Sequence, residues 1–265
     1  MRAGVRRLQT RWAVAVRPRL AWMQLRCRLP LRSGVTVVIV NWNSLAQLQV
    51  SVEAVRKFSP TGTKIIVVDN NSEDGSQSWL NRQDLKVLLL DRNVGHGAAL
   101  DLGVLAARTE YIVTLDVDAF PIAFNWLETL TSLLVNAHVA GAHGGEVLDR
   151  LTPAPPEGWT KRSFVHPCCL AMRLERFVGR RHTFRQVRES GLDVGHLISV
   201  REEGHLGLVE PTSTIGPGAL GTVFGEIVYH NFYGTRIRGD AVVDGLSGTQ
   251  AQAAWDLAVD RYLSV

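Results

Sequence analysis

The chain has 265 residues, 46% of them hydrophobic, which is enough to bury the core of one catalytic domain of ordinary size. Its formal net charge of +4 is unevenly distributed, because nine arginines and no acidic residue stand among residues 1–34, leaving 20 basic against 25 acidic residues from residue 35 onward. The basic character therefore belongs to an N-terminal extension and not to the domain, and nucleic acid is not expected as a partner.

The basic extension, residues 1–34, carries Trp12 and Trp22 among its arginines, which suits the surface of an anionic membrane. Pro18 and Pro30 divide it into pieces shorter than the ~20 apolar residues that span a bilayer, and arginines interrupt every candidate core of a signal peptide. A solvated arm and contact with the inner face of a membrane both remain open. Three cysteines without C-x-x-C spacing suit a reducing cytoplasm.

Residues 35–265 are expected to form a single α/β domain. Helical stripes of apolar residues at i, i+3 and i+4 follow Leu45, Ala98 and Trp126. Short apolar runs alternate with these stripes, and such alternation predicts a mostly parallel central sheet. The runs predicted to form strands are 35–40, 64–69, 86–90 and 111–118.

Polar residues follow each predicted strand, at 41–43, 69–72, 91–93 and 116–118. Ligands of open α/β sheets bind beyond the carboxyl ends of the strands, so these clusters are expected to converge on one crevice. Asp116 and Asp118 would point to the same side of an extended strand and could share one hard divalent cation. Taken alone, such a pair is more often a solvated turn.

Four segments in this order resemble the signature of glycosyltransferase family 2, inverting enzymes with the glycosyltransferase A fold. They are Val-Thr-Val-Val-Ile-Val-Asn-Trp-Asn at 35–43, Ile-Ile-Val-Val-Asp-Asn-Asn-Ser-Glu-Asp-Gly-Ser at 65–76, Arg-Asn-Val-Gly at 92–95, and Asp-Val-Asp at 116–118. Residues 167–173 and 175–177 resemble the acceptor-side strand of the family and the turn after it. The resemblance implies a Rossmann-like domain with a nucleotide-sugar-binding half, 35–135, and an acceptor-side half, 136–265.

The resemblance also implies a donor site. Asp69 would accept a hydrogen bond from the nucleobase, which would pack against the turn of Asn41 and Asn43. Without the resemblance, residues 69–72 form an ordinary Asx-rich turn and Arg92 is a surface arginine. The other residues implied in the donor site are Asn71, Arg92, Asn93, Gly95, His96 and Asp116.

The resemblance places Asp116 at the ribose or at the water shell of a metal ion, and Asp118 on the metal itself. Oxygen ligands and phosphate select a hard cation, Mn²⁺ or Mg²⁺. His230 follows the apolar residues 227–229 and is a candidate third ligand, with a hydrogen-bonded structural histidine as the alternative.

An inverting transfer needs a base for the acceptor hydroxyl, and a carboxylate is the usual choice. Relatives often carry an acidic Glu-Asp-x-Asp motif, but here Leu192 and Gly195 stand where acidic residues are expected. Asp193 is the candidate base and Glu189 the reserve. A helix-capping role for Asp193 is the alternative.

His96 and Asp101 also depart from the family pattern, in which an aromatic residue or alanine and an asparagine are common. Because Gly95 and Gly97 flank His96 at the start of a predicted helix, the histidine could contact a phosphate or the donor sugar. Capping of the helix is the alternative.

The acceptor-side half contains a basic cluster at 179–188 that could meet an anionic acceptor, or could simply be solvated. Trp159, in a proline-rich loop at 152–159, either packs or stacks on a sugar ring. The C-terminal segment 249–263 shows an apolar helical stripe that includes Trp255, for docking within the chain or for a homodimer.

The sequence thus favours a metal-dependent transfer of a sugar from a nucleoside-diphosphate sugar to a hydroxyl of a glycan, glycolipid or small acceptor. A sugar nucleotidyltransferase would ordinarily show a glycine-rich basic loop where Asn41–Ser44 stands, and no G-x-G-x-x-G of a dehydrogenase follows the first strand. A catalytically silent binding subunit remains an alternative because the acidic motif around Asp193 is incomplete.

Overall fold

The structure, a computed structural model, describes residues 30–148, 161–187, 191–216, 220–232 and 246–264, together with Thr235, Val242 and Val243. Most of the basic extension, the loop that contains Trp159, and Glu189 lie outside the described residues. Predictions about these segments therefore stay predictions.

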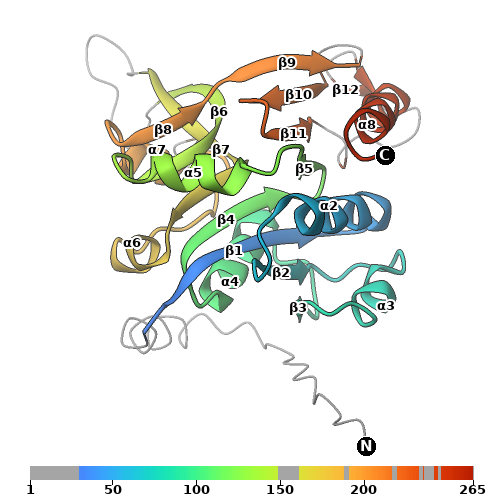
Figure 1. Cartoon of the computed structure of the whole chain (residues 1–265), viewed down its shortest axis with the longest axis horizontal. Coiled ribbons are helices and arrows are strands. Elements are labelled where there is room, and N and C mark those ends of the chain that lie inside the picture. Colours follow the sequence, from blue (N-terminus) through green and yellow to red (C-terminus); the bar gives the residue numbers. More distant parts are fainter. Residues whose placement is uncertain are drawn as a thin grey trace, which may run out of the picture.

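A central sheet of seven strands forms the frame of the domain (Figure 1). Six of the strands run in one direction and β7 runs against both of its neighbours, which confirms the expected mostly parallel sheet. In spatial order the strands are β3 (Lys86–Leu89), β2 (Lys64–Asp69), β1 (Arg32–Asn41), β4 (Thr109–Asp116), β7 (Lys161–Arg173), β6 (Val139–Leu148) and β8 (Leu206–Val209).

Two strand boundaries differ from the prediction. β1 starts at Arg32, inside the segment assigned to the extension, because Arg32 and Val35 already pair with β4. β4 stops at Asp116, and Val117 and Asp118 form a turn instead of continuing the strand. The two aspartates therefore do not share one side of an extended strand, and any convergence of their carboxylates has to come from the turn.

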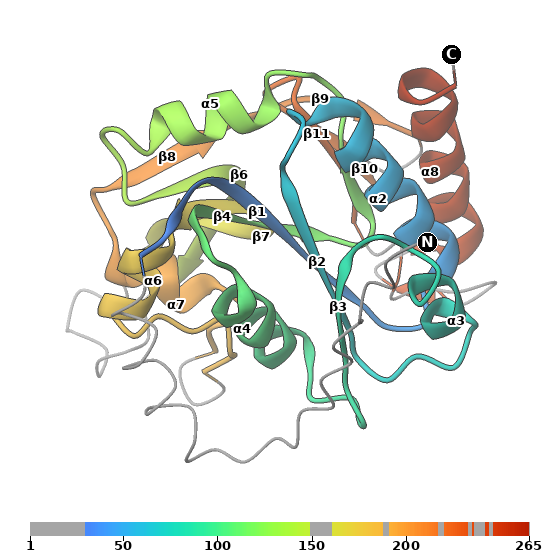
Figure 2. The ribbon, with the colours of Figure 1, turned by 60° about the horizontal axis from the view of Figure 1, so that its bottom comes forward.

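Helices cover both faces of the sheet (Figure 2). The helices that bury residues in one core are α2 (Leu45–Phe58), α3 (Ser76–Leu80), α5 (Trp126–Leu133) and α8 (Gly248–Tyr262). The helices that bury residues in the other core are α4 (His96–Ala106), α6 (Leu174–Gly179) and α7 (His196–Arg201). Of the helices within the described part of the chain, none has both the length and the apolar character needed to cross a membrane.

A smaller antiparallel sheet lies beside the central one (Figure 1). Its strands add buried residues to the core that α2, α3, α5 and α8 cover. Trp255 and Ala258 of α8 are buried, and the ring of Trp255 meets Phe120 edge-on at 5.2 Å. The apolar stripe of the C-terminal helix therefore docks within the chain. The small sheet has the order β5 (Ala119–Pro121), β11 (Val228–Asn231), β10 (Gly221–Phe224) and β9 (Pro211–Ile215), and a further pair consists of β12 (Val242–Val243) and β13 (Leu246–Ser247).

Candidate functional site

A crevice of about 910 Å³ lies beyond the carboxyl ends of β1, β2 and β4. It collects polar side chains from three of the four predicted clusters, because parallel strands end at one edge of the sheet. Three carboxylates line it, and the described lining residues include no lysine or arginine. The carboxylates belong to Asp116, Asp118 and Asp193, and four histidines also line the crevice: His96, His166, His196 and His230.

Asp116, Asp118 and His230 meet at one end of this crevice. Antiparallel pairing of β11 with β5 sets His230 opposite Ala119, directly after the turn that carries Asp118. The Nε2 atom of His230 lies 3.7 Å from Asp116 Oδ2 and 3.6 Å from Asp118 Oδ1, and one ligand atom from each residue lies within 4.8 Å of the others. The turn therefore brings together the carboxylates that a continuous strand was expected to align.

This group fits a hard divalent cation. Asp118 is only 6% exposed and His230 only 4%, and two neighbouring carboxylates in such a place are costly unless a positive charge compensates them. Burial alone would raise the pKa of Asp116, but His96, His230 and His166 hold that pKa well below its ordinary value. Carboxylate oxygens with one imidazole nitrogen suit Mn²⁺ or Mg²⁺ better than a soft ion.

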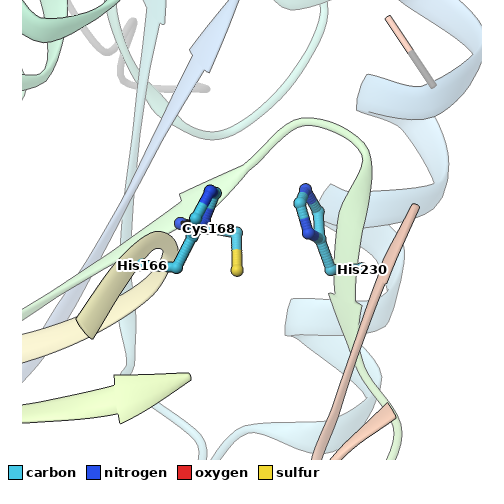
Figure 3. A group of neighbouring side chains, drawn as sticks. All are labelled: His166, Cys168 and His230. Carbon is cyan, nitrogen blue, oxygen red and sulfur yellow. Dashed lines mark hydrogen bonds between the residues drawn. The ribbon is translucent and has the colours of Figure 1, made fainter. Parts of the chain in front are cut away.

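A second group, His166, Cys168 and His230, also has ligand atoms within 4.8 Å of one another. Figure 3 shows His166 and Cys168 side by side and His230 across from them. The backbone N–H of Cys168 donates to Nδ1 of His166 at 3.0 Å, so that nitrogen is already occupied and the proton of the neutral ring is on Nε2. Burial, with Asp116 and Asp118, raises the pKa of the Cys168 thiol well above its ordinary value. A thiol and a protonated nitrogen are poor ligands, so the aspartate group is the better metal site.

The nucleobase residues implied by the resemblance form a buried network at the ends of β1 and β2. The side-chain amide of Asn41 donates to Asp69 Oδ2 at 2.9 Å and to Ser72 Oγ at 3.0 Å, and the backbone N–H of Ser72 donates to Asp69 Oδ1 at 2.9 Å. Asn43 and Asn71 stand in this turn with φ of 50° and 66°. Asn41 and Asp69 are buried and none of these five residues lines the crevice, so the network shapes the turn behind it.

The crevice lining on the donor side comes from the loops that follow β2 and β3. Asn70 donates through its side chain to Asn93 Oδ1 at 3.0 Å and accepts the backbone N–H of Val94 at 2.9 Å, while Asn93 Oδ1 also accepts the N–H of Gly95 at 2.8 Å. Asn70, Asn93 and Gly95 line the crevice. Arg92 is exposed and is not among the lining residues.

His96 is the first residue of α4, but its side chain does not cap the helix. The N-cap position belongs to Gly95, which has no side chain, and His96 lies one position later. The capping alternative is therefore wrong. Instead, Nε2 of His96 lies 3.1 Å from Asp116 Oδ1. The departure from the family pattern thus places an imidazole against the carboxylate that also faces His230. Asp101, the other departure, is buried and accepts hydrogen bonds from the Thr183 hydroxyl and the Phe184 N–H.

Asp193 lines the crevice on the acceptor side. Its Oδ1 accepts the backbone N–H of Val194 at 2.7 Å and a hydrogen bond from the Gln186 side chain. The N-cap of α7 is Gly195 and not Asp193, so the capping alternative is wrong for this residue too. The reserve candidate, Glu189, lies outside the described residues.

The sequence prediction did not assign several lining residues to the site. Trp42, between the two asparagines at the end of β1, is 51% exposed, and its neighbours in sequence could have indicated it. Phe164, His166, His196 and Phe232 also line the crevice. No local pattern singles out these four, because β7, α7 and the residue after β11 reach the crevice only through tertiary packing.

Comparisons with known proteins identify the family of the chain. A family model described as Glycosyl transferase family 2 matches residues 36–173, about half of the chain. The uncharacterized glycosyltransferases Rv0539 of Mycobacterium tuberculosis (strain ATCC 25618 / H37Rv) and Mb0553 of Mycobacterium bovis are each 37% identical over 85 residues, which cover 32% of this chain and 37% of each relative. The match therefore spans little more than a third of the length of these relatives.

Among solved structures, a mannosyltransferase from Pyrobaculum calidifontis in complex with GDP-Man and Mn²⁺ is similar over 74% of this chain and 62% of that one. The TM-score is 0.52 and the sequence identity 18%. At this level of identity the likeness shows the fold alone.

Proposed function

Because the chain belongs to glycosyl transferase family 2, we propose that it is a metal-dependent inverting glycosyltransferase. It would move a sugar from a nucleoside-diphosphate sugar to a hydroxyl group of a glycan, glycolipid or small acceptor. The observation that carries the proposal is the meeting of Asp116, Asp118 and His230 in a crevice that Asp193 also lines. A cation site and a candidate base in one crevice are what a transfer from a diphosphate to a hydroxyl requires.

Asp116, Asp118 and His230 would hold the cation, Mn²⁺ or Mg²⁺. When bound, it would supply a Lewis acid that neutralises charge on the diphosphate leaving group. The fit is supported by the lack of lysine and arginine among the described lining residues, since a diphosphate there has no other strong positive charge to meet. Mn²⁺ in the mannosyltransferase of the same fold agrees with this choice.

The donor would lie along the side of the crevice formed by Asn70, Asn93 and the start of α4. The backbone N–H groups at the N-terminus of α4 and the amide of Asn70 can donate to phosphate or ribose oxygens. The half-exposed ring of Trp42 offers a flat apolar face to the nucleobase. His96 would orient Asp116 through the contact of Nε2 with Oδ1.

Asp193 would act as the general base. Its carboxylate would take the proton of the acceptor hydroxyl as the acceptor oxygen forms a bond to the anomeric carbon of the donor sugar. The bond from that carbon to the diphosphate oxygen breaks on the opposite face, and the nucleoside diphosphate leaves with the bonding electron pair. Attack and departure on opposite faces invert the anomeric configuration.

A catalytically silent binding subunit is the second candidate, and the incomplete acidic motif around Asp193 is the feature that favours it. Such a subunit would bind the nucleoside diphosphate and would not release it from a donor. The rate of nucleoside-diphosphate release from a nucleotide sugar, with Mn²⁺ and with acceptors added, separates the two candidates. A sugar nucleotidyltransferase is disfavoured by the family membership.

A thermal-shift panel of nucleoside diphosphates, each with and without Mn²⁺, tests the proposal first. A ligand at 100 times its Kd stabilises the native state by about 2.7 kcal/mol, so the correct nucleotide should raise the melting temperature by several degrees. The shift should require the metal. Equal shifts in Mn²⁺ and in EDTA, or no shift with any nucleotide, would contradict the proposal.

A further inference from the structure

Five aromatic rings form a continuous wall along the acceptor side of the crevice. The ring of Phe164 lies 4.2 Å from that of His196 and 6.1 Å from that of His166, measured between centroids. The ring of His166 lies 5.3 Å from that of His230, which in turn lies 4.3 Å from that of Phe232. This aromatic wall runs from the segment of the candidate base to the candidate metal ligand, and all five side chains line the crevice.

Backbone hydrogen bonds determine which ring nitrogen carries the proton in two imidazoles of the wall. The backbone N–H of Cys168 donates to Nδ1 of His166 at 3.0 Å, and the backbone N–H of Asp193 donates to Nδ1 of His196 at 3.2 Å. An amide N–H can only donate, so each Nδ1 is an acceptor and each neutral ring carries its proton on Nε2. Both histidines therefore offer an N–H donor to a ligand in the crevice.

Both rings are neutral, because an Nδ1 atom that accepts an amide N–H cannot itself carry a proton. Burial lowers the pKa of His196, although the Asp193 carboxylate opposes that shift. The wall thus combines apolar ring faces with neutral donors.

The carboxylate of Asp193 at one end of the wall disfavours an anionic acceptor. At the other end, the proposed cation would compensate the charges of Asp116 and Asp118. Two arginines of the basic cluster that was predicted to meet an anionic acceptor, Arg180 and Arg181, are exposed and do not line the crevice. Arg185 lies 3.7 Å from Asp101, which is not a lining residue.

We propose, building on the function proposed above, that the acceptor is a neutral sugar that packs one face of its ring on the aromatic wall. The Nε2–H groups of His166 and His196 would donate to its hydroxyl oxygens and so turn one hydroxyl toward Asp193. Hydroxyl groups accept hydrogen bonds from neutral donors without a counter-charge, whereas a carboxylate or phosphate in the same place would meet the negative charge of Asp193. His166 and His196 are specificity-determining residues in this arrangement.

The test measures sugar binding directly, without a nucleotide donor. Saturation-transfer NMR would compare methyl glycosides and short oligosaccharides of neutral hexoses with the matched uronic acids and hexose 6-phosphates. We expect the neutral sugars to bind and the anionic ones to bind at least about tenfold weaker, because their charge would lie near the carboxylate of Asp193. Equal or tighter binding of the anionic sugars, or no binding of any neutral sugar, would overturn the proposal.

Variants of His196 test the donor itself. His196→Phe keeps the ring and removes Nε2–H, and should weaken neutral-sugar binding about five- to tenfold, the value of one neutral hydrogen bond. His196→Gln keeps an N–H donor and should retain more of the affinity. His205→Phe is the matched control, because His205 is exposed outside the crevice. Unchanged affinity in a folded His196→Phe protein would refute the role of His196.

The two proposals fail in distinguishable ways. Metal-dependent nucleotide binding without the neutral-sugar preference refutes the inference about the acceptor and leaves the transferase proposal standing. A neutral-sugar preference that depends on His196, without any metal-dependent nucleotide binding, supports the sugar site and refutes the transferase.

Discussion

Replacing Glu202 with glutamine is expected to lower the free energy of unfolding by about 2 kcal/mol at pH 7, because it removes the charge at the centre of a buried cluster. Glu202 follows α7 and its side chain is 4% exposed. Its carboxylate accepts hydrogen bonds from Arg176 at 3.1 and 2.6 Å, from His182 at 2.7 Å and from His138 at 2.8 Å. These partners belong to α6, to the segment after it and to the residue just before β6, so one side chain holds three parts of the acceptor-side half together.

The magnitude follows from the pKa of this carboxyl group. Burial alone would raise the pKa of Glu202, but hydrogen bonds from Arg176, His182 and His138 hold it at about 2, against an ordinary value of 4.5. At about 1.4 kcal/mol per pKa unit the cluster stabilises the fold by at most about 3.5 kcal/mol, and a glutamine oxygen that still accepts a hydrogen bond reduces the loss to about 2 kcal/mol. The folded pKa is depressed, so this stability is present above pH 4.5 and is lost as the pH falls toward 2.

Urea unfolding of the wild type and of Glu202→Gln, at intervals between pH 7 and pH 3, measures both the size and the pH dependence. The difference in unfolding free energy between the two proteins should narrow as the pH falls below 4.5. Glu175→Gln, at an exposed position on α6, is the control and should unfold like the wild type. Equal stabilities at pH 7, or a gap that does not narrow with acid, would refute the account of the cluster.

Three further predictions concern the crevice and its support. Asp118→Ala should abolish metal-dependent nucleotide binding in calorimetry while circular dichroism stays unchanged; wild-type affinity in that variant would remove the metal site. Asp193→Asn should bind the donor normally but transfer about 10²- to 10⁴-fold more slowly in single-turnover assays, and near-normal transfer would move the base elsewhere. Gly97→Ala should cost about 1–3 kcal/mol in urea unfolding, because its Cβ would lie 2.4 Å from the carbonyl oxygen of Phe184. Gly179→Ala, with open space around the new methyl group, is the control, and equal losses for both would contradict the packing argument.

Local patterns in the sequence predicted much of the frame. The run 64–69 is β2 residue for residue, and the stripe that follows Leu45 is α2, because periods of 2 and 3.6 residues are properties of neighbouring positions. The position of Asp116 at the end of a buried strand could be predicted for the same reason. Local patterns misjudged the turn at Asp118, since two residues carry too little periodicity to separate a strand end from a turn.

Neighbouring residues thus account for the alternation of strands and helices, for the polar strand ends and for the family. Long-range packing accounts for the rest of the site. The pairing of β11 with β5 makes His230 face Asp116 and Asp118, His96 contacts Asp116 instead of capping α4, and His166 joins the aromatic wall. These contacts join segments far apart in the chain, and their geometry is set by strand pairing and core packing, which no local periodicity encodes.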